Sequence, residues 1–279
     1  MIYHSSPDAV LDRIPALAGK KVRWQVLPGG LTNRNYRVDT VDKSFVLRLE
    51  SKHSLDLGLN RELEREVRKN AYNADIGAAI IYAEDGVLLS DFLPGVVWQA
   101  RDLVYDSKLA MLAMLLRKVH ELPSTGKQFS PASAARQYVS MVTKESGLLE
   151  FALRCQEQLE ATQSPEIFRC CHNDIVVCNI IQHSGLKLLD WEYACDNDPM
   201  FDLASLICFH DLRETQVDTL FNAYTGGTDS QMFERLQDQM QVFDIIQWLW
   251  FAARQCSSPD TDASIRLHEL QSRIITNCF

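Results

Sequence analysis

The chain carries two hydrophobic patterns, which change near residues 94 and 95. Before this point, apolar and β-branched residues gather in short runs separated by turn-forming glycine, asparagine and aspartate, which is typical of strands. One charged stretch without internal glycine or proline, 59–74, predicts a helix among these runs. We therefore expect a small antiparallel lobe of about five strands and one helix. The candidate strands are 21–27, 35–40, 44–50, 78–83 and 86–93.

After residue 95 the apolar residues recur mostly at helical spacing. A short helix is also expected at the beginning of the chain, where Val10, Ile14 and Leu17 would share one face. The sequence thus predicts an α+β fold with two lobes, 1–94 and 95–279, the second larger and mainly helical. The long helical stretches of the second lobe are 101–122, 133–162, 200–210 and 239–255.

One stretch, 171–194, interrupts the helical part with two β-prone runs, 175–181 and 186–189. Polar clusters stand at its ends, His-Asn-Asp at 172–174 and Asp-Trp-Glu at 190–192. Packing alone would favour apolar residues there, so these clusters are candidates for chemistry.

The spacing His172-x-Asp174-x4-Asn179 is that of the catalytic loop of kinases. In such a loop the Asp accepts the proton of the attacking hydroxyl and the Asn holds Mg²⁺. Asp190 follows at the end of the next run, and a turn over 185–187 would let Asn179 and Asp190 face one metal. We expect His172 to brace the loop. The alternative is an ordinary Asn-Asp turn followed by a hairpin.

The first lobe offers a phosphate site. A Gly-Gly turn followed by a hydroxyl, 29–33, can present backbone N–H groups to phosphate oxygens. Arg48 lies among apolar strand residues and, if buried, needs a phosphate and a helix carboxylate as partners, for which Glu62 and Glu66 are the candidates. The alternative is that Arg48 reaches solvent on an edge strand. The connector at 86–95 has backbone groups that can pair with adenine. The nucleotide-binding candidates are Gly29, Gly30, Leu31, Thr32, Asn33, Arg48, Glu66, Asp91 and Phe92.

Aromatic residues and a carboxylate beside Asp190 suit a cationic substrate, through cation–π and Coulomb attraction. The substrate-contact candidates are Trp191, Glu192, Tyr193 and, from the late helical run, Trp248. For the aromatic residues of that run, 248–251, helix core is the alternative.

Four further polar residues are expected to support the structure instead of reacting. His120 is expected to form hydrogen bonds at a helix end, and Asp202 to brace the catalytic loop. Asp196 and Asp198 are interpreted as solvated loop or capping residues.

Composition narrows the function. Apolar residues make up 46% and charged residues 23%, as in ordinary globular proteins, and the net charge of −9 disfavours nucleic-acid binding. No signal peptide is visible, and the most apolar late run is too short to span a bilayer. The eight cysteines form no CxxC pair, so reduced thiols and a cytoplasmic location are expected. Oligomeric state and the nucleotide base stay open.

The stretches "GGLTNRNYRV", "FVLRL", "HNDIVVCNII" and "LLDWEYACDNDPMFDLASL" occur in an order that resembles the choline/ethanolamine kinase and thiamine kinase group. This group belongs to the aminoglycoside-phosphotransferase-like, protein-kinase-like superfamily. The resemblance implies an ATP- and Mg²⁺-dependent kinase of a small alcohol. It makes Asp174 the base and Asn179 and Asp190 the metal ligands, with Arg48 where many relatives have lysine.

Several functions stay open on sequence alone. "DWE" replaces the DFG of protein kinases, and no activation segment follows, which disfavours a protein substrate. The expected acceptor is a small cationic alcohol of the choline or ethanolamine type, and thiamine and aminoglycosides are the alternatives. A non-catalytic kinase-like binding module and a metal-dependent hydrolase are the alternatives from other classes.

Overall fold

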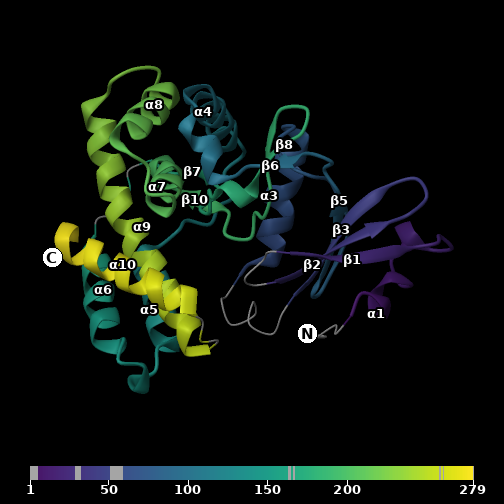
Figure 1. The fold of residues 1–279 in the computed structure, drawn as a ribbon, viewed down its shortest axis with the longest axis horizontal. Coiled ribbons are helices and arrows are strands. Elements are labelled where there is room, and N and C mark those ends of the chain that lie inside the picture. The colour runs from purple at the N-terminus through teal and green to yellow at the C-terminus, as the bar shows by residue number, and fades with distance from the viewer. Residues whose placement is uncertain are drawn as a thin grey trace. The chain divides into compact units, whose positions relative to one another are not determined.

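The computed structural model describes residues 6–28, 33–50, 59–162, 165, 167–257, 259 and 261–278. Its described residues form two compact units. The first contains the chain up to Trp98 together with Cys178–Ala194, and the second contains Gln99–Val177 and the chain from Cys195 onward. Each unit is visible in Figure 1, the first with its sheet and the second with its helices. The expected α+β fold, with an antiparallel N-terminal lobe and a largely helical remainder, is confirmed.

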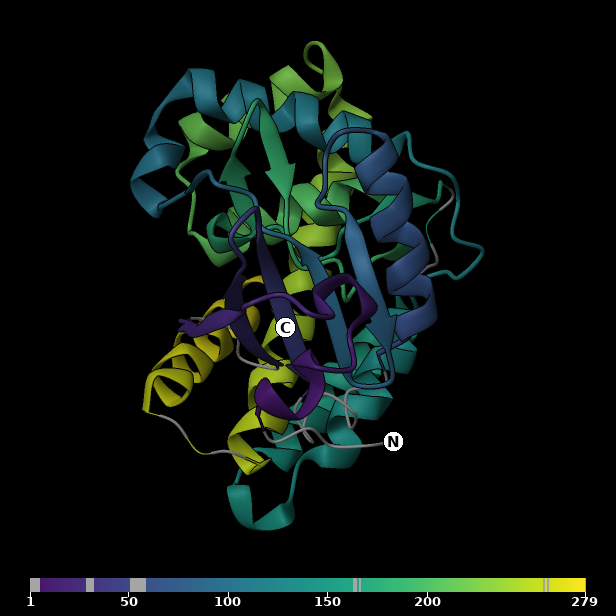
Figure 2. The same cartoon turned by 90° about the vertical axis from the view of Figure 1, so that its right-hand side faces the viewer.

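The main sheet of the first unit is antiparallel, with strand order β1-β2-β3-β5-β4. All five strands and the long helix α3 (Arg61–Asn73) lie where the sequence pattern predicts them. Figure 2 shows α3 beside this sheet. The strands are β1 (Arg23–Leu27), β2 (Asn33–Asp39), β3 (Ser44–Glu50), β4 (Ile80–Glu84) and β5 (Val87–Asp91).

The two faces of β3 have different roles. Phe45, Leu47 and Leu49 are buried in an apolar cluster with residues of α1 (Asp8–Leu11) and the 3-10 helix η1 (Pro15–Leu17). Successive side chains of a strand point to opposite faces, so Arg48 is directed away from this cluster. The apolar positions of the expected leading helix, Val10, Ile14 and Leu17, are all buried, but the segment forms α1 and η1 instead of one helix.

A second sheet of the first unit has the order β6-β8-β9. Its strands are β6 (Val96–Val97), β8 (Ile180–Gln182) and β9 (Leu186–Leu188). The expected hairpin is therefore present, but the turn lies at 183–185, where the His183 N–H donates to the Gly185 carbonyl at 2.8 Å. Positive φ angles at Ser184 (49°) and Gly185 (112°) close this turn.

The run 175–181 is only partly extended. A 3-10 turn, η4 (Val177–Asn179), precedes β8, so the strand begins at Ile180. The polar Asn179 ends this turn instead of lying in the middle of a strand.

The second unit is built from helices packed around α9. Its small antiparallel sheet pairs β7 (Arg169–Cys171) with β10 (Cys195–Asn197). Two short 3-10 helices, η2 and η3, connect larger elements of this unit. No helix among the described residues is long and apolar enough to cross a membrane. The helices are η2 (Ala100–Val104), α4 (Asp106–His120), α5 (Pro131–Met141), η3 (Lys144–Ser146), α6 (Leu149–Ala161), α7 (Pro199–Phe209), α8 (Glu214–Thr225), α9 (Ser230–Ser257) and α10 (Thr261–Cys278).

Candidate active site

A buried ion pair joins the sheet of the first unit to its helix. The Arg48 guanidinium on β3 donates from Nη1 to Glu64 Oε1 at 2.6 Å and from Nη2 to Glu64 Oε2 at 2.8 Å. Two more arginines of α3, Arg61 and Arg68, contact the same carboxylate at 2.8 and 3.1 Å. Burial opposes the charge of Glu64, yet the three guanidiniums hold the pKa of this carboxyl well below its usual value.

Asp190 lies beside this cluster, with its Oδ1 3.7 Å from Arg48 Nη1. Its φ of 57° is left-handed, a conformation that costs a residue with a side chain about 1 kcal/mol or more. Burial and the nearby Glu192 carboxylate raise the pKa of Asp190 to about 7, against the effect of Arg48. An unfavourable backbone conformation and crowded carboxylates together favour a functional role for this residue.

Glu192 is held by two residues of the same unit. Its Oε2 accepts from Asn33 Nδ2 at 2.9 Å and from Arg61 Nη1 at 3.1 Å. The sheet face explains this contact, because Asn33 and Arg48 lie on adjacent antiparallel strands and two residues apart in register.

The β8–β9 hairpin brings Asn179 close to Asp190. Ile180 pairs with Leu188 in the ladder, and the Leu189 N–H donates to the Asn179 carbonyl at 2.8 Å. Asn179 is buried, whereas the Asp190 side chain is about one-third exposed (34%). The hairpin thus places an amide and a carboxylate in neighbouring positions.

In the second unit, Asp202 organises the loop that contains 172–174. Its carboxylate accepts the backbone N–H of His172 at 2.9 Å and of Asn173 at 2.7 Å. The loop continues with the Ile175 N–H, which donates to Ser205 Oγ at 3.1 Å. Asp202 is fully buried on α7, so the expectation that it braces this loop is confirmed.

His120 completes this arrangement. Its Nε2 lies 3.0 Å from Asp202 Oδ2, and its Nδ1 lies 2.7 Å from the Tyr224 hydroxyl. Because the carboxylate can only accept, Nε2 carries the proton. The expected hydrogen-bonding role at the end of α4 is thus confirmed.

Asp196 and Asp198 are not solvated, contrary to one of the two expectations, since both are buried. Asp196 accepts from the Ser124 hydroxyl and from the N–H groups of Thr125 and Gly126. Asp198 caps α7 by accepting the Met200 N–H at 2.9 Å, which confirms the capping role.

Comparison with known proteins decides the family. The model of the phosphotransferase enzyme family matches residues 23–237. The chain belongs to this family of phosphotransferases. Protein LicA of Haemophilus influenzae is 30% identical over 238 residues, which are 80% of this chain and 70% of LicA. A thiamine kinase of Salmonella paratyphi B is 30% identical over 156 residues, 55% of this chain and 54% of that kinase.

Solved structures give the same fold. The crystal structure of choline kinase LicA from Streptococcus pneumoniae aligns with a TM-score of 0.77 at 20% identity, covering 96% of this chain and 98% of that one. This phosphotransferase therefore has the fold of the choline kinase-like structures, as the sequence motifs predict.

The predicted helix partner of Arg48 in the phosphotransferase is corrected. Glu64 forms the pair, not Glu62 or Glu66, both of which are exposed. The apolar stripe of α3 buries Leu63 and Val67, and Glu64 shares that buried face with Arg68. Tracing this stripe in the sequence would have identified Glu64 and revealed Arg61 and Arg68, which the sequence prediction missed.

Two of the predicted substrate contacts, Trp248 and Trp191, are buried. Trp248 is fully buried on α9, where its indole N–H donates to the Leu267 carbonyl and its ring packs against Phe151. Trp191 is buried as well, with its indole N–H donating to the Leu188 carbonyl at 3.2 Å. Each aromatic ring is part of the packed interior, which for Trp248 agrees with the helix-core alternative.

Two backbone N–H groups of the connector that were expected to be available to adenine already have acceptors. The Asp91 N–H donates to the Ala79 carbonyl at 2.9 Å, and the Phe92 N–H donates to the Ser44 carbonyl at 3.2 Å. Both donors are used within the sheet, and the Asp91 side chain pairs with Lys43. The predicted phosphate turn Gly29, Gly30, Leu31 and Thr32 lies outside the described residues.

The residues of the first unit fit a nucleotide phosphate and a divalent cation. Among the described residues, the buried Arg48 Nε, Arg61 Nη2 and Arg68 Nε have no acceptor. Buried N–H groups without acceptors are unfavourable, and a phosphate oxygen would satisfy them. Asn179 and Asp190 offer the hard oxygen ligands that Mg²⁺ prefers. A structure of LicA in complex with AMP, with a TM-score of 0.76, has the same fold.

Proposed function

We propose that this phosphotransferase is an ATP-dependent small-molecule kinase, which transfers the γ-phosphate to the hydroxyl of a small cationic alcohol of the choline or ethanolamine type. The observation that carries the proposal is the Arg48–Glu64 pair next to Asp190, in a chain with a kinase-type His172-Asn173-Asp174 loop. Similarity to LicA over 80% of the chain supports the acceptor class.

In this proposal Asp174 accepts the proton of the substrate hydroxyl as its oxygen attacks the γ-phosphorus in line with the leaving ADP. The O–H and γ-phosphate–ADP bonds break, a new P–O bond forms, and the proton moves to the Asp174 carboxylate. The loop is prepared for this role because Asp202 holds the two preceding N–H groups. His172 is a positioning residue, since its backbone forms one of these bonds.

The first unit supplies the charge that binds phosphate. Arg48, fixed in orientation by Glu64, directs its remaining N–H to a phosphate oxygen, and Arg61 and Arg68 add nearby positive charge. Asn33, from the strand after the proposed phosphate turn, keeps Glu192 in place. Asn179 and Asp190 would hold Mg²⁺, which neutralises charge that develops on the transferred phosphoryl group.

The acceptor class rests on charge as well as similarity. Tyr193, three positions after Asp190, would offer an aromatic ring to a cation, and Glu192, although paired with Arg61, would add negative charge nearby. Thiamine is the second candidate acceptor, because thiamine kinases match 55% of the chain at the same 30% identity. A cytoplasmic location is part of the proposal, since the eight cysteines are free thiols and ATP is required.

The test is ADP release from Mg-ATP with choline, ethanolamine, thiamine and an aminoglycoside as acceptors. We expect choline or ethanolamine to give the highest kcat/KM, and Asp174→Asn to lower kcat by about 10²- to 10⁴-fold while ATP binding is retained. Full activity of Asp174→Asn would contradict the role of the base. ATP binding without turnover of any acceptor would favour a binding module, and phosphate release without acceptor would favour a hydrolase.

A further inference from the structure

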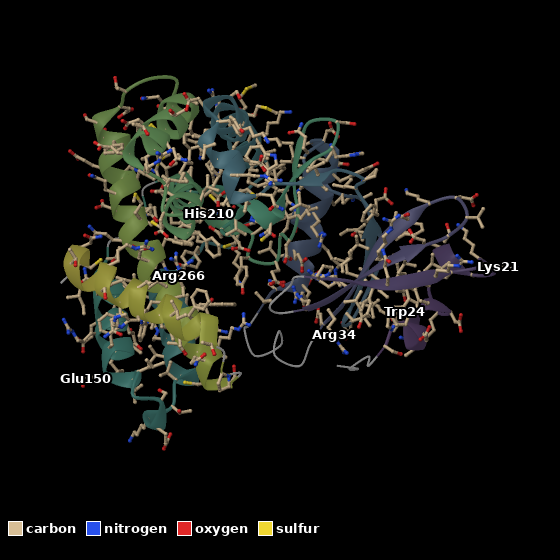
Figure 3. The ribbon with its side chains drawn as sticks, in the orientation of Figure 1. Lys21, Trp24, Arg34, Glu150, His210 and Arg266 are labelled. Carbon is tan, nitrogen blue, oxygen red and sulfur yellow. The ribbon has the colours of Figure 1, made fainter. Side chains whose placement is uncertain are left out.

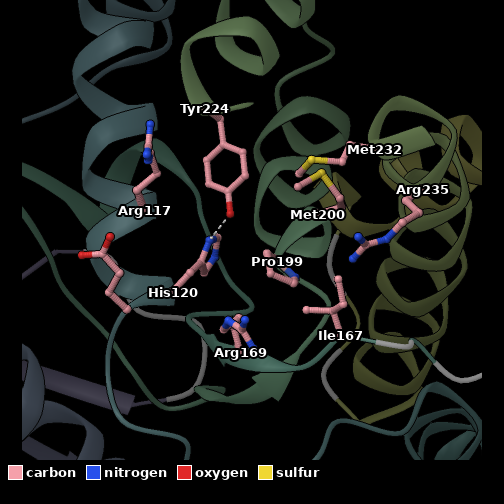
Figure 4. Close-up of a pocket in the computed structure, with 10 residues that line it drawn as sticks. Arg117, His120, Ile167, Arg169, Pro199, Met200, Tyr224, Met232 and Arg235 are labelled. Atoms are coloured by element: carbon pink, nitrogen blue, oxygen red, sulfur yellow. Dashed lines mark hydrogen bonds between the residues drawn. The ribbon is translucent and has the colours of Figure 1, made fainter. Parts of the chain in front are cut away.

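The second unit contains a cavity of about 230 Å³ that involves neither the phosphate-binding arginines of the first unit nor Asp174. The cavity, drawn in Figure 4, is enclosed by five elements: the end of α4, strand β7, the beginning of α7, the end of α8 and the beginning of α9. Three arginines on three of these elements line it: Arg117 on α4, Arg169 on β7 and Arg235 on α9. We call this cavity the arginine pocket.

The arginine pocket is positive in a chain whose net charge is −9. Its lining includes one acidic residue, Glu121. Arg235 is neutralised by a two-bond contact with Asp198, at 2.8 and 3.3 Å. Arg117 and Arg169, in contrast, form no ion pair with any residue that the structure describes, and both are exposed. Two guanidiniums without a carboxylate partner at one cavity favour a doubly charged anion.

The remaining walls indicate an organic anion. Met200, Met232, Pro199 and Ile167 supply apolar surface, and the Tyr224 hydroxyl is the polar group between them. A small molecule with a phosphate monoester and a short organic part would match both halves of this lining. A phosphate monoester, which carries up to two negative charges, balances the two guanidinium charges better than a singly charged carboxylate.

A chain of hydrogen bonds leads from the pocket to the loop of Asp174. Burial raises the pKa of Tyr224, so its hydroxyl is protonated and donates to His120 Nδ1 at 2.7 Å. His120 Nε2 donates to Asp202, which accepts the N–H groups of His172 and Asn173. Tyr224 and Asn173 are half-buried, and His120, Asp202 and His172 are buried, so a change in Tyr224 would reach the loop.

We propose that the arginine pocket binds a small phosphate monoester, and that the bound anion acts through Tyr224, His120 and Asp202 to hold the 172–174 loop more rigidly. The phosphate group contacts Arg117 and Arg169, and its organic part lies against Met200 and Met232. Binding itself does not depend on the proposed kinase activity. Its effect on turnover rests on that proposed function.

Calorimetric titration with inorganic phosphate and with phenyl phosphate tests the binding site. We expect both anions to bind. A lower Kd for phenyl phosphate indicates that the natural ligand is an organic monoester, whereas equal Kd values indicate free phosphate. In the double variant Arg117→Ala/Arg169→Ala, the Kd for phenyl phosphate should rise at least tenfold. Lys118→Ala, an exposed cation on the same helix outside the pocket lining, should leave the Kd within twofold.

Both anions can also bind to Arg48, Arg61 and Arg68 of the first unit, so the same titration is repeated with Arg48→Ala. We expect the arginine-pocket affinity to be retained there. Equal binding by the wild type and by the double variant, or no binding by the wild type, would overturn the proposal. Arg117 and Arg169 are exposed, so their substitution should leave the fold intact, and circular dichroism should be used to check folding of each variant.

Amide hydrogen exchange tests the connection to the loop. Phenyl phosphate should slow exchange at His172 and Asn173 severalfold in the wild type. Tyr224→Phe keeps the pocket charge, so its Kd should stay within threefold, but the slowing should be lost. Equal slowing in Tyr224→Phe and the wild type would show that the hydrogen-bond chain is not the route. This readout does not require turnover, so it separates failure of this proposal from failure of the proposed function.

Discussion

Arg48 on β3 and Glu64 on α3 form a two-bond ion pair with both residues buried. The pair is 16 positions apart in sequence and ties the sheet of the first unit to its helix. It also fixes the guanidinium 3.7 Å from Asp190. Three arginines contact the Glu64 carboxylate, so this residue supplies much of the negative charge that balances the cluster.

Glu64→Ala should therefore lower the free energy of unfolding by about 3–5 kcal/mol, since it leaves buried guanidiniums without their carboxylate. The KM for ATP should also rise. Urea unfolding and steady-state kinetics measure the two effects. Glu62→Ala and Glu66→Ala on the exposed side of the same helix should stay within about 0.5 kcal/mol of the wild type. An effect of equal size in these controls would contradict the assignment of Glu64.

Asp202→Asn should lower kcat more than it raises any KM, because the amide oxygen can accept only part of the hydrogen bonds that position the 172–174 loop. Faster amide exchange at His172 and Asn173 should accompany the loss. Asp218→Asn, an exposed position in the same unit, is the matched control. Unchanged exchange at both amides would show that Asp202 does not hold the loop.

Removal of divalent cations with EDTA should abolish phosphotransfer, and added Mg²⁺ should restore it. In Asp190→Asn the Mg²⁺ concentration for half-maximal rate should rise by on the order of tenfold or more, because a charged ligand becomes neutral. Asp238→Asn, exposed on α9, should keep the wild-type Mg²⁺ dependence. Full turnover in EDTA would argue against a metal at Asn179 and Asp190.

Acid should destabilise the second unit through His210. Figure 3 labels this residue, whose Nε2 accepts the Val177 N–H at 3.1 Å. Burial lowers the pKa of His210 to about 4 in the folded chain. Between about pH 6.5 and pH 4, this histidine therefore binds a proton in the unfolded chain but not in the folded chain. The contribution of neutral His210 to the free energy of unfolding is therefore complete above about pH 6.5 and is lost as the pH falls towards 4.

His210→Gln keeps a hydrogen-bond acceptor but does not titrate. Urea midpoints measured at pH 7, 6, 5 and 4.5 should fall less steeply for this variant than for the wild type. His268→Gln replaces an exposed histidine and should follow the wild-type curve. Parallel curves for all three proteins would exclude His210 as the titrating group.

Local pattern was sufficient for much of this protein. The five strands, α3 and the helices of the second unit follow from side-chain periodicity, which each segment carries by itself. The motif spacing around Asp174, Asn179 and Asp190 identified the family that the comparison confirmed. Asp202 could be predicted as a brace because it lies within a motif of that family.

Tertiary structure decided the partners. Which carboxylate meets Arg48 depends on how α3 turns its buried stripe towards the sheet, and that choice excluded Glu62 and Glu66 in favour of Glu64. Packing of α9 against its neighbours likewise decided that Trp248 is interior. Sequence determines which segments form strands and helices, since these preferences are local. Pairing and burial depend on residues far apart in the chain, and only their approach in space settles them.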